Sequence, residues 1–536
     1  MNMKKSIACA AGLLAALALS AGEKRYVAFG HEFQDITPEV LLSNVGALDA
    51  TALDGIGFGI RAPKPYDWRM GTNHLFDGPL WNRKAFAGYI PGFRQAFRHR
   101  SLRHCFLTLM RAPYKRVPWE DDAAWGHAVS NFASVAWFAK RAGFRGLCID
   151  TEDYHQTRQF FRIEGDLPYD ELVKLARRRG QEMFKAVFGE FPDATVLSYW
   201  FFSTFPGVGY AHAADPAGCV REAGDLWPAF MNGMLDVAPP SARFVDGDEK
   251  GYDYEAERGD FWRAAVEQRQ LLEANVAEEN RAKFRLQMMP SFGIYLDKYV
   301  NPPTNRHYAP PSNGSRLRRF VQNLDQATEA AGEYVWFWNE KDCWVKWNGD
   351  KILPKVVSRR TYDEIYPGIS AMMKCLKDRS RLPADLPENL CTPEKVGRWS
   401  DGKVKGSLVR AGDEFVATGV ERGGFSVRRE KVLPGDVYGV RFRFRGEKTS
   451  LGVSWKSEGK WIPPGVGIAS GPADAQGWRT GEATVVIPPR IDTLVLALGV
   501  NGQGPDESCR FRDIEIYHLG VDRPGQLDSE RNKPAN

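Results

Sequence analysis

Short apolar runs alternate with amphipathic segments from residue 25 to residue 378, and this alternation restricts the fold more than any other feature of the sequence. Runs of this length, with many aromatic and branched side chains, are typical of buried strands, whereas the segments between them have helical periodicity. Strands and helices in strict alternation build a parallel sheet covered by helices. The expected strands are 26–33, 55–60, 105–110, 146–152, 196–202, 244–249, 284–292 and 334–340.

Eight such units over about 350 residues indicate an α/β protein with a (β/α)8 TIM barrel, which we place at residues 24–378. A doubly wound sheet is the alternative, and it favours a phosphate-binding glycine loop between a strand and a helix. The nearest match, Gly55-Ile-Gly57-Phe-Gly59, lies inside an expected strand, so we predict no dinucleotide site. The expected helices are 38–48, 82–97, 124–142, 167–188, 226–237, 260–277, 315–331 and 362–376.

The sequence changes character after the barrel. Prolines and charges at 379–398 predict an extended linker, and short alternating runs separated by Gly and Pro predict an all-β sandwich at 399–518. Three motifs follow one another there: Val432-Leu-Pro-Gly-Asp-Val-Tyr438, Gly477-Trp-Arg-Thr-Gly-Glu-Ala-Thr-Val-Val-Ile-Pro-Pro489 and Phe511-Arg-Asp-Ile-Glu-Ile516. With these motifs the region resembles jelly-roll, galactose-binding-like carbohydrate-binding modules of secreted polysaccharide hydrolases. Residues 519–536 form a polar tail.

Residues 1–21 have the pattern of a secretory signal peptide. Lys4 and Lys5 precede an uncharged apolar run at 7–19, and small residues up to Ala21 offer a cleavage site. This run is shorter than the roughly 20 residues that a bilayer span needs, and no later stretch qualifies. We therefore expect a secreted or periplasmic protein without membrane insertion. Lys and Arg number 72 against 67 Asp and Glu, a balance that argues against a nucleic-acid partner.

A pair of carboxylates, Asp150 and Glu152, ends the fourth expected strand. Residues two apart on a strand share a face, and barrel enzymes place catalytic groups at the carboxyl ends of their strands. One carboxylate of such a pair raises the pKa of the other, which keeps it protonated for donation to a leaving group. Tyr154 and His155 follow directly and are predicted to bind substrate beside the pair.

The segment Gly146-Leu-Cys-Ile-Asp150-Thr-Glu152 resembles the fourth-strand signature of chitinase and endo-β-N-acetylglucosaminidase barrels. This resemblance implies a glycoside hydrolase acting on a polysaccharide or oligosaccharide, with Glu152 as proton donor and Asp150 as its neighbouring carboxylate. Arg145 and Cys148 replace acidic residues of the family pattern. The resemblance therefore carries over the placement of Glu152 rather than chemistry assisted by an N-acetyl group.

A glycosidase with two carboxylates needs a partner for Glu152 across the barrel mouth, about 5 Å away for retention or about 6.5–9.5 Å for inversion. The sixth strand offers Asp248 and Glu249, which alternation places on opposite faces. We favour Glu249 as nucleophile or base, because the small Gly247 on its face suits a crowded barrel interior. Asp248 and Glu340, which follows the eighth strand, remain alternatives and are otherwise expected to bind substrate.

Aromatic side chains near the strand ends are the expected floor for sugar rings, because the chain is 12% aromatic. Trp200, Trp336 and Trp338 are predicted to line the mouth, and Glu32 after the first strand is predicted to bind substrate hydroxyls. Scattered histidines, without H-E-x-x-H, and cysteines without C-x-x-C predict no metal and no cofactor. Two other functions remain open: a non-catalytic carbohydrate-binding protein, and a barrel enzyme of lyase or transferase chemistry.

Overall fold

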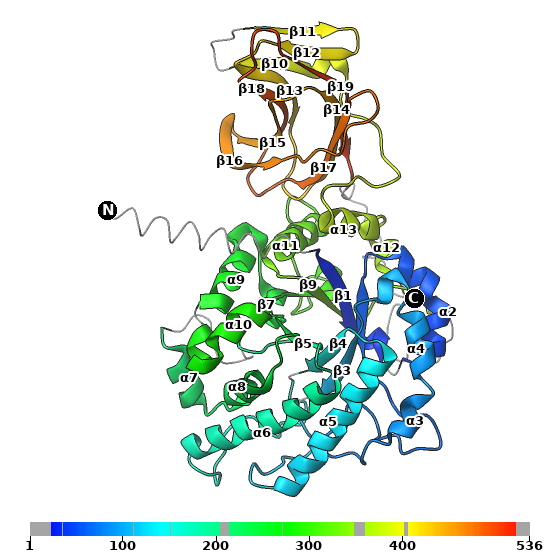
Figure 1. Ribbon diagram of the computed structural model, residues 1–536, viewed down its shortest axis with the longest axis vertical. Helices are drawn as coiled ribbons and strands as arrows, with labels where there is room; N and C mark the ends of the chain where they lie inside the picture. Colours follow the sequence, from blue (N-terminus) through cyan, green and yellow to red (C-terminus); the bar gives the residue numbers. More distant parts are fainter. Residues whose placement is uncertain are drawn as a thin grey trace. The chain divides into compact units, whose positions relative to one another are not determined.

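The computed structural model describes residues 23–34, 36–110, 112–150, 152–203, 214–270, 272–347, 360–400 and 406–520. The predicted signal peptide and residues 521–536 of the predicted tail lie outside this part of the chain. The chain divides into two compact units, Met1–Lys298 with Gln326–Ile365 and Tyr299–Asp325 with Tyr366–Asn536 (Figure 1). The limits of the predicted domains and linker stay predictions.

The first unit is built on a parallel sheet in the order β7-β6-β5-β4-β3-β2-β1-β9-β8. Its strands are β1 (Arg25–Gly30), β2 (Gly55–Phe58), β3 (Phe106–Met110), β4 (Gly146–Asp150), β5 (Thr195–Ser198), β6 (Arg243–Asp246), β7 (Met288–Pro290), β8 (Gly293–Tyr295) and β9 (Tyr334–Asn339). All of them lie within four residues of the expected spans. They are almost entirely buried, as expected for a parallel sheet that helices cover.

Strands β7 and β8 together fill the seventh position of the barrel. β7 pairs with β6, and β8 pairs with β9. The two halves remain joined to their neighbours at the break, because the Ser291 amide donates to the Asp246 carbonyl at 2.8 Å and the Trp336 amide donates to the Phe292 carbonyl at 3.1 Å. Hydrogen bonding therefore closes around eight strand positions, and the predicted (β/α)8 barrel is confirmed.

The seventh strand begins later than the sequence suggested, because residues 284–287 belong to a helix. Phe284 and Gln287 are buried, one helical turn apart, which sets one face of that helix against the protein. The α-helices are α2 (Pro38–Ala50), α3 (Arg83–Ala87), α4 (Ile90–Ala96), α5 (Asp122–Ala142), α6 (Tyr169–Glu190), α7 (Pro216–Ala223), α8 (Trp227–Val237), α9 (Asp260–Gln270), α10 (Arg281–Gln287), α11 (Arg316–Ala330), α12 (Tyr362–Ile365) and α13 (Ile369–Lys377).

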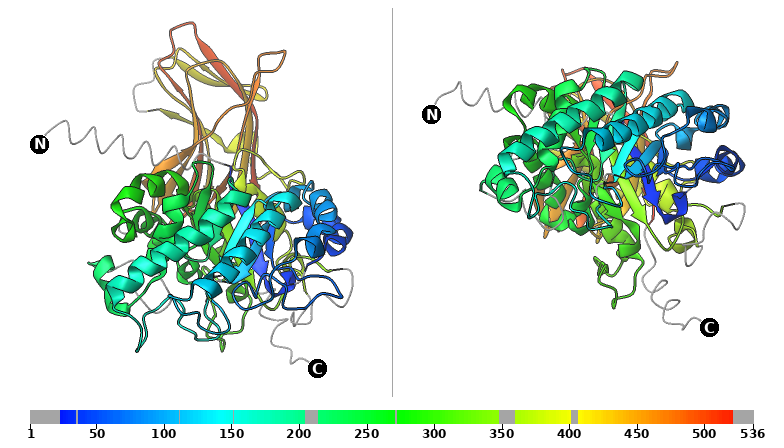
Figure 2. Two further views of the ribbon diagram at one scale, coloured as in Figure 1. Left: turned by 60° about the horizontal axis from the view of Figure 1, so that its bottom comes forward. Right: turned by 90° about the horizontal axis from the view of Figure 1, so that it is seen from below.

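Helix α5 illustrates how local sequence sets the limits of a barrel helix. Its first turn is capped by the Asp121 carboxylate, which accepts the Ala124 amide at 2.9 Å. It ends at Gly143, whose φ of 89° is a left-handed conformation that glycine adopts without strain. In the first unit the helices drawn from blue to green surround the sheet (Figure 2). Within the described parts of the chain, no helix has both the length and the apolar character that a membrane span requires.

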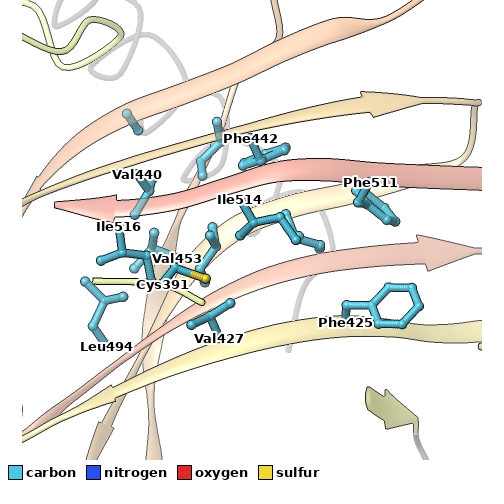
Figure 3. Close-up of a cluster of buried hydrophobic side chains, with 14 of the residues drawn as sticks. Cys391, Phe425, Val427, Val440, Phe442, Val453, Leu494, Phe511, Ile514 and Ile516 are labelled. Carbon is cyan, nitrogen blue, oxygen red and sulfur yellow. The ribbon is translucent and has the colours of Figure 1, made fainter. Parts of the chain in front are cut away.

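The second unit contains two five-stranded antiparallel sheets, β10-β13-β18-β15-β16 and β11-β12-β19-β14-β17. Side chains from both sheets interleave in one core, where Val427, Val440, Leu494 and Ile516 point toward one another (Figure 3). The predicted sandwich is confirmed. Its strands are β10 (Val396–Ser400), β11 (Ser407–Ala411), β12 (Glu414–Thr418), β13 (Arg422–Glu430), β14 (Val437–Arg445), β15 (Thr449–Ser457), β16 (Lys460–Gly467), β17 (Arg479–Val486), β18 (Thr493–Asn501) and β19 (Ser508–His518).

Two of these strands, β10 and β16, were not expected from the sequence. Both are edge strands with largely exposed side chains, so neither shows the apolar alternation of a half-buried strand. Pro463 and Pro464 lie in β16, and an edge strand tolerates proline because one side of it needs no ladder hydrogen bond. β10 begins inside the segment expected to be a linker. The same segment contributes Cys391 to the sandwich core.

Candidate active site

Asp150 and Glu152 lie at the carboxyl end of β4. Asp150 is the last residue of the strand and is buried, and its carboxylate accepts the Glu152 amide at 3.0 Å. Glu152 is partly exposed, and its own carboxylate accepts a hydrogen bond from the Tyr154 hydroxyl. Asp150 therefore fixes the backbone after the strand, while the side chain of Glu152 remains accessible to solvent.

Glu249 follows β6 and lies within electrostatic reach of both residues. It begins the 3₁₀ helix η4 (Glu249–Asp253), and its amide donates to the Tyr199 carbonyl at 3.1 Å. Burial raises the pKa of Glu249 to about 9, with further contributions from the charges of Glu152, Asp150 and Asp248. The structure thus brings together Asp150, Glu152 and Glu249 from two strands that are not neighbours in the barrel.

Asp248 points away from this group toward helix α9. It is buried, and its Oδ2 accepts hydrogen bonds from the Tyr254 hydroxyl and the Gln268 amide, both at 2.9 Å. Its φ of 41° and ψ of 70° are left-handed, which turns the chain so that the next residue, Glu249, faces the other way. Burial and the nearby Asp246 raise the pKa of Asp248 to about 7. Asp248 therefore positions Glu249 and does not reach the solvent at the barrel mouth.

Asp246, the last residue of β6, organises the loop after β5. Its carboxylate accepts the amides of Phe201, Phe202 and Ser203 at 2.8 to 3.0 Å, as well as the Ser203 hydroxyl. Burial raises its pKa, and these four donors lower it. Asp246 is not among the residues predicted for the site. The sequence does hold an indication of its role, because an acidic side chain in an apolar strand is buried there and then requires hydrogen-bond donors.

Tyr199 and Tyr252 lie within electrostatic reach of Glu249, and neither is among the residues predicted for the site. The pKa of Tyr199 lies well above its ordinary value because of burial and the charges of groups that include Asp150 and Glu249. Tyr252 is shifted the same way by burial and by Glu249 and Glu152. Both phenols therefore keep their protons at neutral pH and can donate hydrogen bonds at the site. Alternation could have indicated Tyr199, which lies two residues after the buried Leu197 of β5.

The ring of Trp336 packs against both of these tyrosines. Its ring stacks on Tyr199 with centroids 4.6 Å apart, and Tyr252 lies 5.5 Å from it. The indole nitrogen donates to the Gly247 carbonyl at 2.7 Å. Trp336 is 0% exposed, so it holds other site residues and presents no surface to a ligand. Trp200, also predicted to line the mouth, is likewise buried.

Trp338 and Glu340 are the more accessible members of the group predicted around the eighth strand. Trp338 is half-buried, and its indole nitrogen donates to the Glu340 carboxylate at 3.1 Å. Its ring also meets His31 edge to face at 5.8 Å. Glu340 in turn contributes to the raised pKa of Tyr252, which places it at the edge of the same site.

Glu32 has a different environment from the one that its predicted binding role implies. It is fully buried, and its carboxylate accepts hydrogen bonds from the Asn339 side chain, the Trp344 amide and the Trp347 indole at 2.9 Å each. Burial raises its pKa to about 7. These contacts tie the segment after β9 to the end of β1. His155, by contrast, is exposed, and its ring contacts that of Tyr114 at a centroid distance of 3.9 Å.

The described residues contain no group of three or more His, Cys, Asp or Glu arranged to hold a metal ion. The group of Asp150, Glu152 and Glu249 combines a buried carboxyl group that keeps its proton at neutral pH with two other acidic side chains whose charges act on it. Such a group suits hydrolysis of a bond that needs both protonation and attack.

The chain matches no protein-family model and no curated protein. Solved structures similar to this chain include a GH5-4 broad-specificity endoglucanase from an uncultured bacterium, at 8% identity and TM-score 0.35, covering 68% of this chain and 95% of that one. Another is a Thermobaculum terrenum O-GlcNAc hydrolase mutant, at 8% identity and TM-score 0.30, covering 59% of this chain and 55% of that one. The CBM22-1 xylan-binding domain of Paenibacillus barcinonensis Xyn10C is matched at 13% identity and TM-score 0.19, covering 24% of this chain and 90% of that one.

Proposed function

We propose that this protein is a glycoside hydrolase that cleaves an oligosaccharide or polysaccharide with Glu152 and Glu249. The observation that carries the proposal is that the charge on Glu152 raises the pKa of Glu249, although the two follow different strands. Burial and, after it, this charge keep Glu249 protonated at neutral pH, so Glu249 can supply a proton while Glu152 supplies a negative charge. The resemblance of Gly146–Asp150 and Glu152 to chitinase-type barrels supports the placement of Glu152 at the site.

The sequence gives the proton-donor role to Glu152, but the environment of Glu249 favours the opposite assignment. With a pKa of about 9, Glu249 holds its proton at neutral pH. Glu152 is more exposed and receives the Tyr154 hydroxyl, which stabilises its ionised form. We therefore assign general acid chemistry to Glu249, and nucleophilic or base chemistry to Glu152.

In this mechanism Glu249 gives its proton to the glycosidic oxygen as the bond from that oxygen to the anomeric carbon breaks. Glu152 either attacks the anomeric carbon, forming an ester that water then hydrolyses, or removes a proton from the attacking water. Tyr252, which is partly exposed, supplies a phenol donor for sugar hydroxyls, and Trp338 supplies an accessible ring face. General acid catalysis of this kind contributes about 10²–10⁴-fold to the rate.

The decisive experiment measures release of reducing ends from a panel of polysaccharides by the wild type, Glu152→Gln and Glu249→Gln. Glu222→Gln is the matched control, because Glu222 is an exposed carboxylate on the outer helix α7. We expect both site variants to lose about 10²-fold or more, and the control to keep wild-type activity. Binding of a polysaccharide without cleavage by the wild type favours the alternative, a carbohydrate-binding protein. Full activity of both site variants excludes the pair.

Export and sugar binding by the sandwich complete the proposal. The signal-like residues 1–21 support a secreted or periplasmic location, where polysaccharides are met outside the cytoplasm. In the sandwich Trp461 is 58% exposed, whereas Trp455 is only 4% exposed. Trp461 is thus the better candidate of the two for contact with a sugar ring. Nucleic acid has no place in the proposal.

A further inference from the structure

Exposed aromatic side chains gather at one part of the barrel rim. Among the described residues of the first unit, five tyrosines and tryptophans are exposed. Four of them follow β2, β3 and β4, and only Trp262 lies on an outer helix, α9. The four are Tyr66, Trp68, Tyr114 and Tyr154. Their common position at the carboxyl ends of three successive strands points to a ligand, because single exposed apolar residues are otherwise scattered.

A continuous row of rings connects three of these loops. His155, after β4, contacts Tyr114, after β3, with centroids 3.9 Å apart and the rings tilted by 31°. Tyr114 stacks in turn on His74, after β2, at 4.7 Å and nearly parallel. His74 meets Trp68 at 5.1 Å and 88°. The row starts beside Tyr154, the residue whose hydroxyl contacts Glu152, so it leads from the proposed catalytic carboxylate to Trp68.

Trp68 has a larger exposed fraction than Tyr114 or His74 in this row. It is 60% exposed, whereas Tyr114 is 44% exposed and contacts the imidazoles of His74 and His155. The backbone that carries Trp68 is held in a hairpin, since the Ala62 amide donates to the Met70 carbonyl at 2.8 Å and the Thr72 amide to the Ile60 carbonyl at 3.0 Å. The held backbone and the contact of the indole with His74 restrict this side chain, so it loses less conformational entropy than a free one when a ligand covers it.

Polar groups surround the exposed indole. The Arg61 guanidinium lies 6.0 Å from the ring centroid, and Arg69 pairs with Asp67 at 2.8 Å on the same hairpin. A flat ring bordered by hydrogen-bonding groups matches a pyranose, which presents C–H bonds on its face and hydroxyls around its edge. The electron-rich face of the indole attracts those C–H groups, and the charged side chains can bind the hydroxyls.

We propose that Trp68 is the stacking platform of a distal subsite, which binds a pyranose ring of the same sugar chain that is cleaved at Glu152 and Glu249. The inference rests on the proposed glycosidase function and extends it, because it requires a substrate of several sugar units. The ligand class is a neutral oligosaccharide of pyranose units with an apolar ring face. The row from His155 to Trp68 sets the direction in which that chain runs from the catalytic pair.

The test measures binding separately from cleavage. Cellohexaose, xylohexaose and chitohexaose are titrated into the Glu152→Gln chain by calorimetry, with and without Trp68→Ala. We expect Trp68→Ala to weaken binding of the preferred hexasaccharide about 3- to 10-fold, and Trp68→Phe to weaken it less because a flat ring remains. Trp262→Ala is the matched control, since Trp262 is also an exposed tryptophan, 45% exposed, on the outside of the barrel.

Equal affinities of the Trp68→Ala and Trp262→Ala chains overturn the inference, as does a lack of binding by all three hexasaccharides. Both variants should have the melting temperature of the wild type, which shows that a change in affinity comes from the binding surface and not from loss of the fold. Failure of the proposed function is a different result, in which the wild type binds a hexasaccharide but releases no product. Loss of that binding in Trp68→Ala then still supports the subsite.

Discussion

The charge on Glu152, which follows β4, raises the pKa of Glu249, which follows β6. The environment of each glutamate depends on more than its neighbours in the sequence. Asp150 accepts the amide of Glu152, and the left-handed backbone of Asp248 turns Glu249 toward the same space. Two aspartates therefore set the positions of two glutamates, and the fold couples the glutamates electrostatically.

The first prediction concerns the proton on Glu249. Its pKa of about 9 has burial as its largest cause and the charge of Glu152 as the next. Glu152→Gln removes that charge, so the pKa of Glu249 should fall while remaining above its ordinary value. Carbon NMR titration of 13C-labelled glutamate carboxyl groups measures this shift, with Glu222→Gln as control. An unchanged Glu249 pKa in Glu152→Gln contradicts the coupling.

The second prediction concerns stability. A carboxyl group whose folded pKa is raised binds its proton more tightly when folded, so it costs stability as pH rises from the unfolded pKa of 4.5 to about 9. Glu249→Gln removes this cost and should raise the melting temperature at pH 8 by about 2 °C or more, with little change at pH 4. Calorimetric scans at the two pH values test it. A lower melting temperature at pH 8 argues against the raised pKa.

The third prediction separates the catalytic roles. Glu249→Gln, lacking the proton donor, should lose about 10²–10⁴-fold on ordinary glycosides but much less on dinitrophenyl glycosides, whose leaving group needs no protonation. Glu152→Gln should be impaired on both substrate classes, because attack is still required. Comparing kcat/KM for the two variants on matched substrates decides the assignment. The reverse pattern returns the acid role to Glu152, as the sequence suggested.

The fourth prediction concerns Asp246, which holds the loop after β5. Asp246→Ala leaves the buried amides of Phe201, Phe202 and Ser203 without their acceptor, and each unsatisfied group costs about 1–3 kcal/mol. We therefore expect the free energy of unfolding to fall by at least about 1–3 kcal/mol, the cost of one unsatisfied amide. Urea denaturation measures it. Asp253→Ala, at a largely exposed carboxylate, is the control and should change stability by about 0.5 kcal/mol or less.

The fifth prediction distinguishes two tryptophans of the sandwich. Trp455 is packed in the core, so Trp455→Ala should cost about 3–5 kcal/mol of stability. Trp461→Ala, at an exposed position on β16, should leave stability nearly unchanged but weaken retention of the protein in polysaccharide-containing gels. Affinity electrophoresis together with denaturant unfolding tests both statements. Unaltered retention in Trp461→Ala removes that residue from any sugar-binding face.

The barrel and the sandwich could be predicted because burial on both faces of a parallel strand, or on one face of an antiparallel one, leaves a direct pattern in the sequence. Strand β9 is an example, with apolar side chains along nearly its whole length. Strand β16 leaves no such pattern, since its side chains are exposed. Residues 284–287 were expected to start the seventh strand, since Phe284 and Leu286 alternate as in a strand. They form the end of α10 instead, where Phe284 and Gln287 are buried and Leu286 is exposed.

Individual site residues were harder to predict than the strands that carry them. Trp336 and Trp338 lie two residues apart, yet Trp336 is completely buried and Trp338 is partly accessible. The alternation of side chains along a strand shows which face a residue lies on, but not how deep it lies in the barrel. Tyr252 lies in a 3₁₀ helix beyond β6, where no strand pattern extends. Glu32 is an acidic residue at a strand end, as expected of a binding residue. Its carboxylate, however, accepts hydrogen bonds from three residues that are more than 300 positions away in the sequence.

The stacking of His74, Tyr114 and His155 also affects how the rim of this barrel can be re-engineered. Each ring belongs to a different loop, and the central ring is packed on both sides by the other two. Replacing any one loop by a foreign sequence removes a ring from this row and leaves the neighbouring loops without that contact, although Asp150 still holds the backbone at Glu152. Loop exchange aimed at a new specificity should therefore transfer the loops after β2, β3 and β4 together, as one cassette.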